Sequence, residues 1–155
     1  MNDAMINIPV KIKKLKPNAA IPTYGSINAA GADLYACIDS ALVVRPGETV
    51  LVPTGLSMEL PEGYAGLIYA RSGLASKKGL APANKVGVID SDYRGEVLVA
   101  LHNHSPEGSG AAVVEPGERI AQLVIAPYIK GIFEETDALS DTKRGEGGFG
   151  STGTK

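Results

Sequence analysis

Short stretches of alternating apolar and polar residues run through most of the chain. In residues 6–12, isoleucine and valine alternate with asparagine, proline and lysine. A period of two places the apolar side chains on one face of an extended strand. Because Pro9 cannot donate to an interior ladder, we expect this strand to begin or border a sheet. Residues 97–101, VLVAL, predict a second strand of the same kind.

Two further segments place Pro-Gly between runs of β-branched residues. They are LVVRPGETVLV at residues 42–52 and AVVEPGERIAQLVI at residues 112–125. Pro-Gly suits the central positions of a type II turn, so each segment predicts a hairpin. Both contain the pattern VVxPGE, which records either an internal duplication or two independent turns. We favour independent turns, because Pro-Gly between valines arises readily.

A single short helix is expected, in residues 72–80, SGLASKKGL. Ser72 is the predicted N-cap and Gly79 the predicted end. Many short strands with one short helix are typical of closed barrels and double-sheet jelly rolls. The predicted fold class is therefore all-β.

Composition agrees with this prediction and narrows the possible partners. The chain has 155 residues, enough for one domain, with 19 glycines, 10 prolines and no tryptophan. A net charge of -2 provides no broad field for a polyanion, so we expect no nucleic-acid partner. Cys37 is the only cysteine, which excludes an intramolecular disulfide and favours a reducing compartment. No apolar run has signal-peptide or membrane-span length, so we expect a soluble, cytoplasmic protein without a membrane partner.

Candidate chemistry lies in four blocks of the body. In GVIDSDYRGE, residues 87–96, Asp90 directly follows a buried strand, a position suited to a carboxylate that deprotonates water. Arg71 stands beside the predicted helix N-terminus, where an anion is favoured, although a surface ion pair is the simpler interpretation. Asp33, in AGADLYA, is a strand-edge carboxylate. Arg119 and Gln122 are separated by an odd number of positions on one predicted strand, which places their side chains on opposite faces.

The tail, residues 143–155, reads KRGEGGFGSTGTK. It cannot form a core of its own and would be frayed in isolation. Glycine-rich backbone can nevertheless wrap amide groups around phosphate oxygens, with Arg144, Ser151 and Thr152 adding hydrogen bonds. Phe149 would provide a stacking face for a base. His102 and His104 share a strand face, but they lack a third ligand and are expected to be polar rim residues.

Taken together, five blocks closely resemble the five motifs of the trimeric dUTP diphosphatase (dUTPase) family. In chain order they are AGADLYA, ARSGLA, GVIDSDYRGE, RIAQLVI and RGEGGFGSTG, and they span residues 30–153. The resemblance implies a jelly-roll-like antiparallel β subunit with one short helix and a homotrimer whose active sites combine motifs of more than one subunit. It divides the chain into a β domain, residues 1–142, and a flexible lid, residues 143–155, that closes over a neighbouring subunit's site.

The resemblance also implies the reaction, the hydrolysis of dUTP to dUMP and pyrophosphate. This would limit uracil incorporation into DNA and supply dUMP for thymidylate synthesis. Asp90 would direct water at the α-phosphorus. Mg²⁺ would be held by the substrate phosphates and waters rather than by direct protein ligands. Asp33 would support the site by organising the arginines or the metal-bound waters.

The other site residues implied by the resemblance contact the substrate. Tyr93 would pack under the deoxyribose and exclude a ribose 2′-hydroxyl. The uracil base would be contacted by Asn84, Gly87, Val88, Ile89 and Phe149. The α- and β-phosphates would be contacted by Arg71, Ser72, Gly73 and Gln122. The γ-phosphate end would be contacted by Arg144, Gly150, Ser151 and Thr152. Two other functions remain open. A dCTP deaminase would share the fold, and a non-catalytic trimeric β module would bind nucleotides or proteins without turnover.

Overall fold

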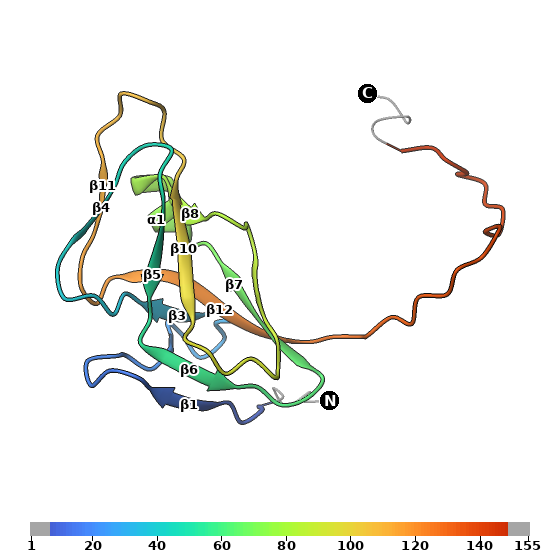
Figure 1. Ribbon diagram of the computed structural model, residues 1–155, viewed down its shortest axis with the longest axis horizontal. Coiled ribbons are helices and arrows are strands. Elements are labelled where there is room, and N and C mark those ends of the chain that lie inside the picture. The colour runs from blue at the N-terminus through green and yellow to red at the C-terminus, as the bar shows by residue number, and fades with distance from the viewer. Residues whose placement is uncertain (1–6, 149–155) are drawn as a thin grey trace.

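A computed structural model describes residues 7–148 of the protein and confirms the all-β class (Figure 1). Within these residues the chain forms twelve strands and one helix. In chain order they are β1 (Lys11–Lys14), β2 (Thr23–Tyr24), β3 (Ala32–Tyr35), β4 (Leu42–Val44), β5 (Thr49–Pro53), β6 (Leu56–Glu59), β7 (Tyr64–Tyr69), α1 (Ser72–Lys78), β8 (Leu80–Pro82), β9 (Gly87–Ile89), β10 (Leu98–Asn103), β11 (Ala112–Val114) and β12 (Arg119–Pro127).

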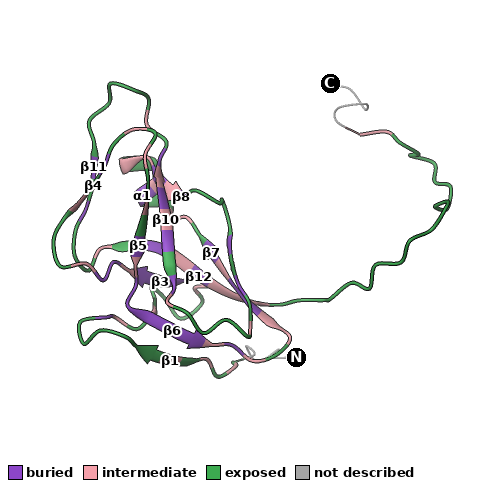
Figure 2. Ribbon diagram, in the orientation of Figure 1, coloured by how far each residue is buried: buried purple, intermediate pink, exposed green. Residues whose placement is uncertain are grey.

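The largest sheet has the strand order β2-β3-β12-β7-β9, and a second sheet has the order β5-β10-β8. Two strand pairs, β4 with β11 and β1 with β6, complete the body, and every pairing is antiparallel. One apolar core draws side chains from both larger sheets, among them Leu34 and Ile68 from the first and Val52 and Leu101 from the second. In Figure 2, buried residues alternate with intermediate or exposed ones along β10. The result is a jelly-roll-like body.

The strand predicted in residues 6–12 is present in shortened form. Ile8, Val10 and Ile12 are half-buried and alternate with exposed residues, as expected. The ladder to β6 begins only at Lys11, after Pro9, and β1 forms the edge of its pair. Residue 6 lies outside the described residues. The strand in residues 97–101 is confirmed as β10, with Val99 and Leu101 buried.

The two predicted hairpins are wrong, although both turns exist. Gly47 and Gly117 have φ of 76° and 72°, as the third residue of a type II turn requires. The strands flanking each turn, however, do not pair with each other. β4 pairs with β11, β5 with β10, and β12 with β3 and β7. Each turn therefore connects two different sheets. Alternation predicts which face of a strand is buried, but it does not predict the strand with which it pairs.

The two VVxPGE segments instead pair with each other, with Val43 opposite Val113. Each turn also binds the other half of the chain in the same way. The amide of Gly47 donates to the Asn103 carbonyl at 2.9 Å, and that of Gly117 donates to the Ala36 carbonyl at 2.8 Å. This equivalence of contacts is what an internal duplication would produce, and two independent turns would not require it.

The helix is confirmed, with different ends from those expected. Ser72 is its first residue rather than its N-cap; Arg71 holds the cap position in an extended conformation and makes no side-chain cap hydrogen bond. Gly79 ends the helix with a left-handed φ of 67°, as predicted. Leu80 already belongs to β8.

Beyond Pro127 the chain leaves the body as an extended arm, residues 128–148 (Figure 1). Its large apolar side chains have no cover in the single chain; Ile129 and Phe133 are each 98% exposed. The predicted boundary at residue 142 falls within this arm and stays a prediction. In the described part of the chain, no helix is long and apolar enough to cross a membrane.

Candidate active site

Asp33 lies between two arginines on the outer face of the five-stranded sheet. Its Oδ1 accepts a hydrogen bond from Arg71 Nε at 2.7 Å, and its Oδ2 lies 3.3 Å from an Arg119 guanidinium nitrogen. The Asp33 side chain is only 13% exposed, whereas that of Arg119 is 53% exposed. Two cations around one carboxylate leave a net positive charge, which suits an anionic ligand.

The expectation that Arg119 and Gln122 lie on opposite faces is wrong. Arg119 pairs with Tyr35, Ala121 with Leu34 and Gln122 with Asp33, so β12 carries one extra residue against β3. Such a bulge reverses the alternation of side chains. Ile120 and Ala121 are consequently both buried, and Arg119 and Gln122 both reach the Asp33 face. Arg119 was not among the predicted site residues, because nothing in the sequence shows a bulge.

Gln122 is held in place by its neighbours. Its amide nitrogen donates to the Ala70 carbonyl at 2.8 Å. A Cβ added at Gly31 would overlap the Gln122 side chain, so only glycine leaves room for this amide. Ser72 and Gly73 lie exposed at the start of α1, directly after Arg71. The structure therefore brings together Asp33, the predicted supporting residue, with Arg71 and Gln122, two predicted phosphate contacts, and it adds Arg119.

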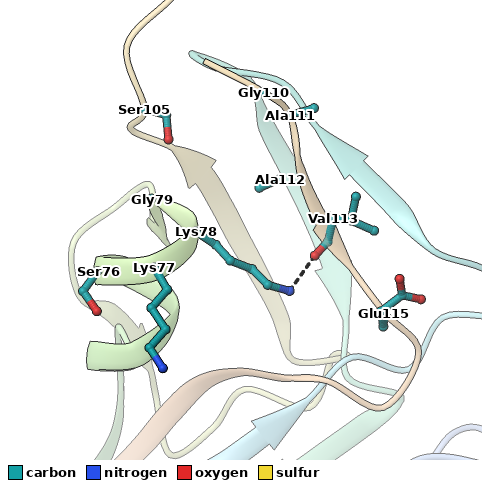
Figure 3. Close-up of a pocket in the computed structure, with 10 residues that line it drawn as sticks. All are labelled: Ser76, Lys77, Lys78, Gly79, Ser105, Gly110, Ala111, Ala112, Val113 and Glu115. Carbon is teal, nitrogen blue, oxygen red and sulfur yellow. Dashed lines mark hydrogen bonds between the residues drawn. The ribbon is translucent and has the colours of Figure 1, made fainter.

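Helix α1 is fixed at its other end by Lys78. The Lys78 ammonium donates to Glu118 Oε1 at 2.5 Å and to the Val113 carbonyl at 2.8 Å. Figure 3 shows Lys78 crossing from α1 toward Val113 on β11, along a hollow of about 480 Å³. Because Glu118 directly precedes Arg119, both ends of α1 are tied to one short part of the chain. This connection also lay outside the sequence-based expectations.

Asp90 follows the last residue of β9, as predicted, and is exposed. With Val88, Tyr93, Leu98 and their neighbours it lines a hollow of about 210 Å³. The Tyr93 hydroxyl donates to the Glu96 carbonyl at 2.9 Å, and a Cβ at Gly95 would overlap the tyrosine ring. These contacts fix the ring beside Asp90. The arrangement combines a carboxylate, an aromatic ring and apolar walls, as is typical of small-molecule sites.

The turn before β9 carries the other predicted uracil contacts. Asn84 is exposed, and its amide nitrogen would lie 3.3 Å from a Cβ at Gly87, so it packs over that glycine. Lys85 has a positive φ of 66°, a left-handed conformation that is uncommon for residues other than glycine. Val88 is 63% exposed, with Gly87 and Ile89 buried on either side of it. Ile89 and Val88 line the hollow, whereas Asn84, in the preceding turn, and Gly87, the first residue of β9, do not.

The two halves of the predicted site do not meet within one chain. Asp33, Gln122 and Tyr69 lie in one row across β3, β12 and β7, whereas Asp90 follows Ile89, which pairs with Gly66. Three strand spacings and about four residues of rise separate Asp33 from Asp90, on the order of 20 Å. This is a separation of backbone positions, and it is too long for the Asp33 and Asp90 carboxylates to contact each other.

Other predicted residues stand apart from both halves. Arg144 lies on the extended arm, where its Nε donates to the Gly147 carbonyl at 2.7 Å. Phe149, Gly150, Ser151 and Thr152 lie outside the described residues.

His102 and His104 meet edge to face, with ring centroids 4.5 Å apart, and His102 Nδ1 hydrogen-bonds the Thr49 hydroxyl. Desolvation, with smaller effects of the Lys85 and His102 charges, lowers the pKa of His104. Across residues 7–148, no three His, Cys, Asp or Glu side chains converge to hold a metal ion.

Known proteins resemble this chain over nearly its full length. The sequence profile of the dUTPase family matches residues 17–153. A deoxyuridine 5'-triphosphate nucleotidohydrolase of Desulfitobacterium hafniense is 53% identical, covering 96% of this chain and 99% of its own. A dUTPase of Staphylococcus bacteriophage 80alpha, solved with dUpNHpp, has a TM-score of 0.85 at 30% identity and covers 95% and 99%.

A dUTPase from phage phi11 of S. aureus, described as revealing the coordination of a structural Mg(II) ion, has a TM-score of 0.75 at 25% identity and covers 84% and 98%. The chain therefore belongs to the dUTPase family of nucleotide hydrolases.

Proposed function

We propose that this protein hydrolyses dUTP to dUMP and pyrophosphate, and so limits uracil incorporation into DNA while supplying dUMP for thymidylate synthesis. The observation that carries the proposal is the presence, in one chain, of both an anion-binding cluster around Asp33 and a hollow that contains Asp90 and Tyr93. A nucleoside triphosphate has both an anionic and an aromatic end. The named relatives support dUTP as this nucleotide.

Asp90 is the general base in this account. Its carboxylate accepts a proton from a water molecule, whose oxygen bonds to the α-phosphorus. The bond from the α-phosphorus to the oxygen bridging it to the β-phosphate breaks, and that oxygen leaves with pyrophosphate. Asp90 is exposed at a strand end and its backbone carbonyl accepts the Tyr93 amide at 3.1 Å, which fixes the turn that presents it.

Selectivity for base and sugar would come from the turn and the hollow. Asn84 and the β9 backbone would hydrogen-bond the uracil edge, and the tight turn would exclude a larger or differently substituted pyrimidine. The Tyr93 ring, held by Glu96 and Gly95, would pack under the deoxyribose. A 2′-hydroxyl would then meet the ring face and lose its hydrogen bonds.

The cluster at the other end would bind the phosphates. Arg71 and Gln122 would contact the α- and β-phosphates with Ser72 and Gly73, and Ser72 would lie near the bridging oxygen that leaves. Asp33 would act by orienting Arg71, which it binds at 2.7 Å. Positioning and charge neutralisation would then account for most of the rate enhancement.

Magnesium would bind to the protein through the phosphates of the substrate. The described residues hold no cluster of metal-ligating side chains, and Mg²⁺ usually keeps several waters and binds substrate phosphates, so the phosphates and waters would hold it here. When bound, it would neutralise charge on the triphosphate. Asp33 would organise either the arginines or the metal-bound waters. The structural Mg(II) ion described for the phi11 enzyme supports a role for this metal.

The separation of Asp90 from the phosphate cluster leads us to propose a homotrimer whose sites take the two halves from different subunits. Both halves would have to reach the α-phosphate, and within one chain they lie on the order of 20 Å apart. The apolar side chains of the arm, including Ile129 and Phe133, are exposed in the single chain and would be covered by another subunit.

The lid, residues 143–155, would close over a neighbouring subunit's site. Thirteen extended residues reach about 40 Å, enough for such a crossing. Arg144, Gly150, Ser151 and Thr152 would then contact the γ-phosphate end while Phe149 stacks on uracil. Closure would exclude bulk water from the site. The reducing compartment expected from the lone cysteine stays a prediction.

The test is pyrophosphate release from dUTP, dTTP, dCTP and UTP, with and without Mg²⁺. We expect magnesium-dependent release from dUTP far above the other three. Ammonia released from dCTP would instead identify a deaminase. No release from any of the four by the folded protein would contradict the proposal and favour a non-catalytic binding module.

A further inference from the structure

We infer that Arg119 is a positioning residue for the triphosphate end of the substrate, an inference that rests on the proposed function. The resemblance to the five family motifs implies no role for Arg119. In the structure it is the second cation at Asp33, and it also binds Arg71 through its backbone. One Arg71 guanidinium nitrogen lies 3.4 Å from the Arg119 carbonyl oxygen.

The geometry divides the two oxygens of Asp33 between the two arginines. Oδ1 accepts a hydrogen bond from Arg71 Nε at 2.7 Å, and Oδ2 accepts one from the Arg119 guanidinium at 3.3 Å. A carboxylate with only one partner could rotate and let Arg71 swing away. With Arg119 in place the carboxylate is held from both sides, so the Arg71 guanidinium is presented in one orientation.

Charge gives Arg119 a second effect. Asp33 with Arg71 alone would be neutral, whereas Asp33 with both arginines carries one net positive charge. Arg119 is 53% exposed, and a guanidinium has five N–H donors, of which the described contacts use one. Arg119 lies on the same face of the sheet as Asp33, where an anionic ligand would lie.

Stability does not explain the arrangement. A half-exposed ion pair at 3.3 Å contributes little to folding. The bulge at residues 119–121, however, is required for Arg119 to reach Asp33 at all, because regular alternation would turn the side chain to the other face. A local distortion that delivers a weakly stabilising contact to the phosphate end indicates a functional role.

The experiment compares R119Q and R119K with the wild type by equilibrium binding of inorganic tripolyphosphate and of dUMP. We expect R119Q to weaken tripolyphosphate binding about tenfold and dUMP binding less than about twofold, because dUMP carries a single phosphate. R119K should recover part of the loss, since it restores the charge but not the planar fork. R45Q is the matched control: Arg45 is 75% exposed, pairs with Glu48 at 4.0 Å and lies in the related Pro-Gly turn.

Binding separates this inference from the proposed function. A wild type that binds tripolyphosphate but releases no pyrophosphate from dUTP would refute the proposed function and leave the Arg119 measurement valid. Equal tripolyphosphate affinity in R119Q and wild type would overturn the inference. Equal weakening of tripolyphosphate and dUMP, or loss of the folded assembly in both R119Q and R119K, would also overturn it, because Arg119 would then be a structural residue.

Discussion

At the scale of single residues, the site depends on side chains whose positions are fixed by close neighbours. Asp33 is held by two arginines, Gln122 by the Ala70 carbonyl, and Tyr93 by the Glu96 carbonyl. Asp90 differs, because its side chain is exposed and only its backbone is fixed. An exposed carboxylate at the mouth of a hollow remains available to a water molecule.

Replacing Asp90 by asparagine tests this role at constant side-chain size. We expect the turnover number for dUTP to fall by a factor of about 10² to 10⁴, the contribution of general-base catalysis. The Michaelis constant should change little, because the amide still fills the position. Steady-state kinetics with a thermal melt for folding provides the measurement, and near-normal turnover would show that Asp90 is not the base.

Gly31 tests the placement of Gln122. An added methyl group would overlap the Gln122 side chain and displace its amide from the Ala70 carbonyl. We expect Gly31→Ala to raise the Michaelis constant for dUTP about three- to tenfold, the worth of one hydrogen bond. Gly25→Ala is the control, since a Cβ there has no atom within 4 Å. Identical constants for the two variants would remove Gln122 from the binding site.

At the scale of elements, the sequence predicts faces well and partners poorly. Alternation identified the strand ending at Leu101, and Ser72 and Gly79 identified the short helix, because both are local patterns. The hairpins failed because pairing depends on the whole sheet, and the opposite-face prediction failed because one extra residue in β12 reverses its alternation. The motif residues Asp33, Arg71 and Gln122 lie together because they share one end of one sheet. The contact of Arg119 with Asp33 and the Lys78–Glu118 pair could not be predicted from the sequence.

The Lys78–Glu118 pair tests how α1 is held. Lys78→Met removes an ion pair at 2.5 Å and a hydrogen bond at 2.8 Å. Both side chains are partly exposed, so we expect the free energy of unfolding to fall by about 1 kcal/mol. The catalytic efficiency with dUTP should fall as well, because Ser72 and Gly73, the proposed phosphate contacts, are the first two residues of this helix.

Urea unfolding at one fixed protein concentration measures the loss. Lys77→Met is the matched control, because Lys77 lies on the same helix and makes no ion pair or side-chain hydrogen bond with the other described residues. If the two variants unfold at the same urea concentration, the pair does not hold the helix.

At the scale of the whole molecule, the arm, residues 128–148, extends away from the body that precedes it. We expect deletion of residues 143–155 to reduce dUTP turnover severely, because the predicted contacts of Arg144 and Phe149 are lost. The melting temperature and assembled mass should stay unchanged. A shorter deletion, residues 153–155, removes none of the predicted contacts and should be active. Full activity after the longer deletion would mean that the tail has no part in catalysis.

The sharing of each site between subunits is the central claim, and subunit mixing tests it most directly. Arg71→Ala and Asp90→Asn subunits would each be inactive alone. If each site takes Arg71 from one subunit and Asp90 from another, unfolding and refolding an equal mixture should restore about a quarter of wild-type dUTP turnover. If both residues act from the same subunit, every site in the mixture lacks one of them, and the mixture would stay inactive.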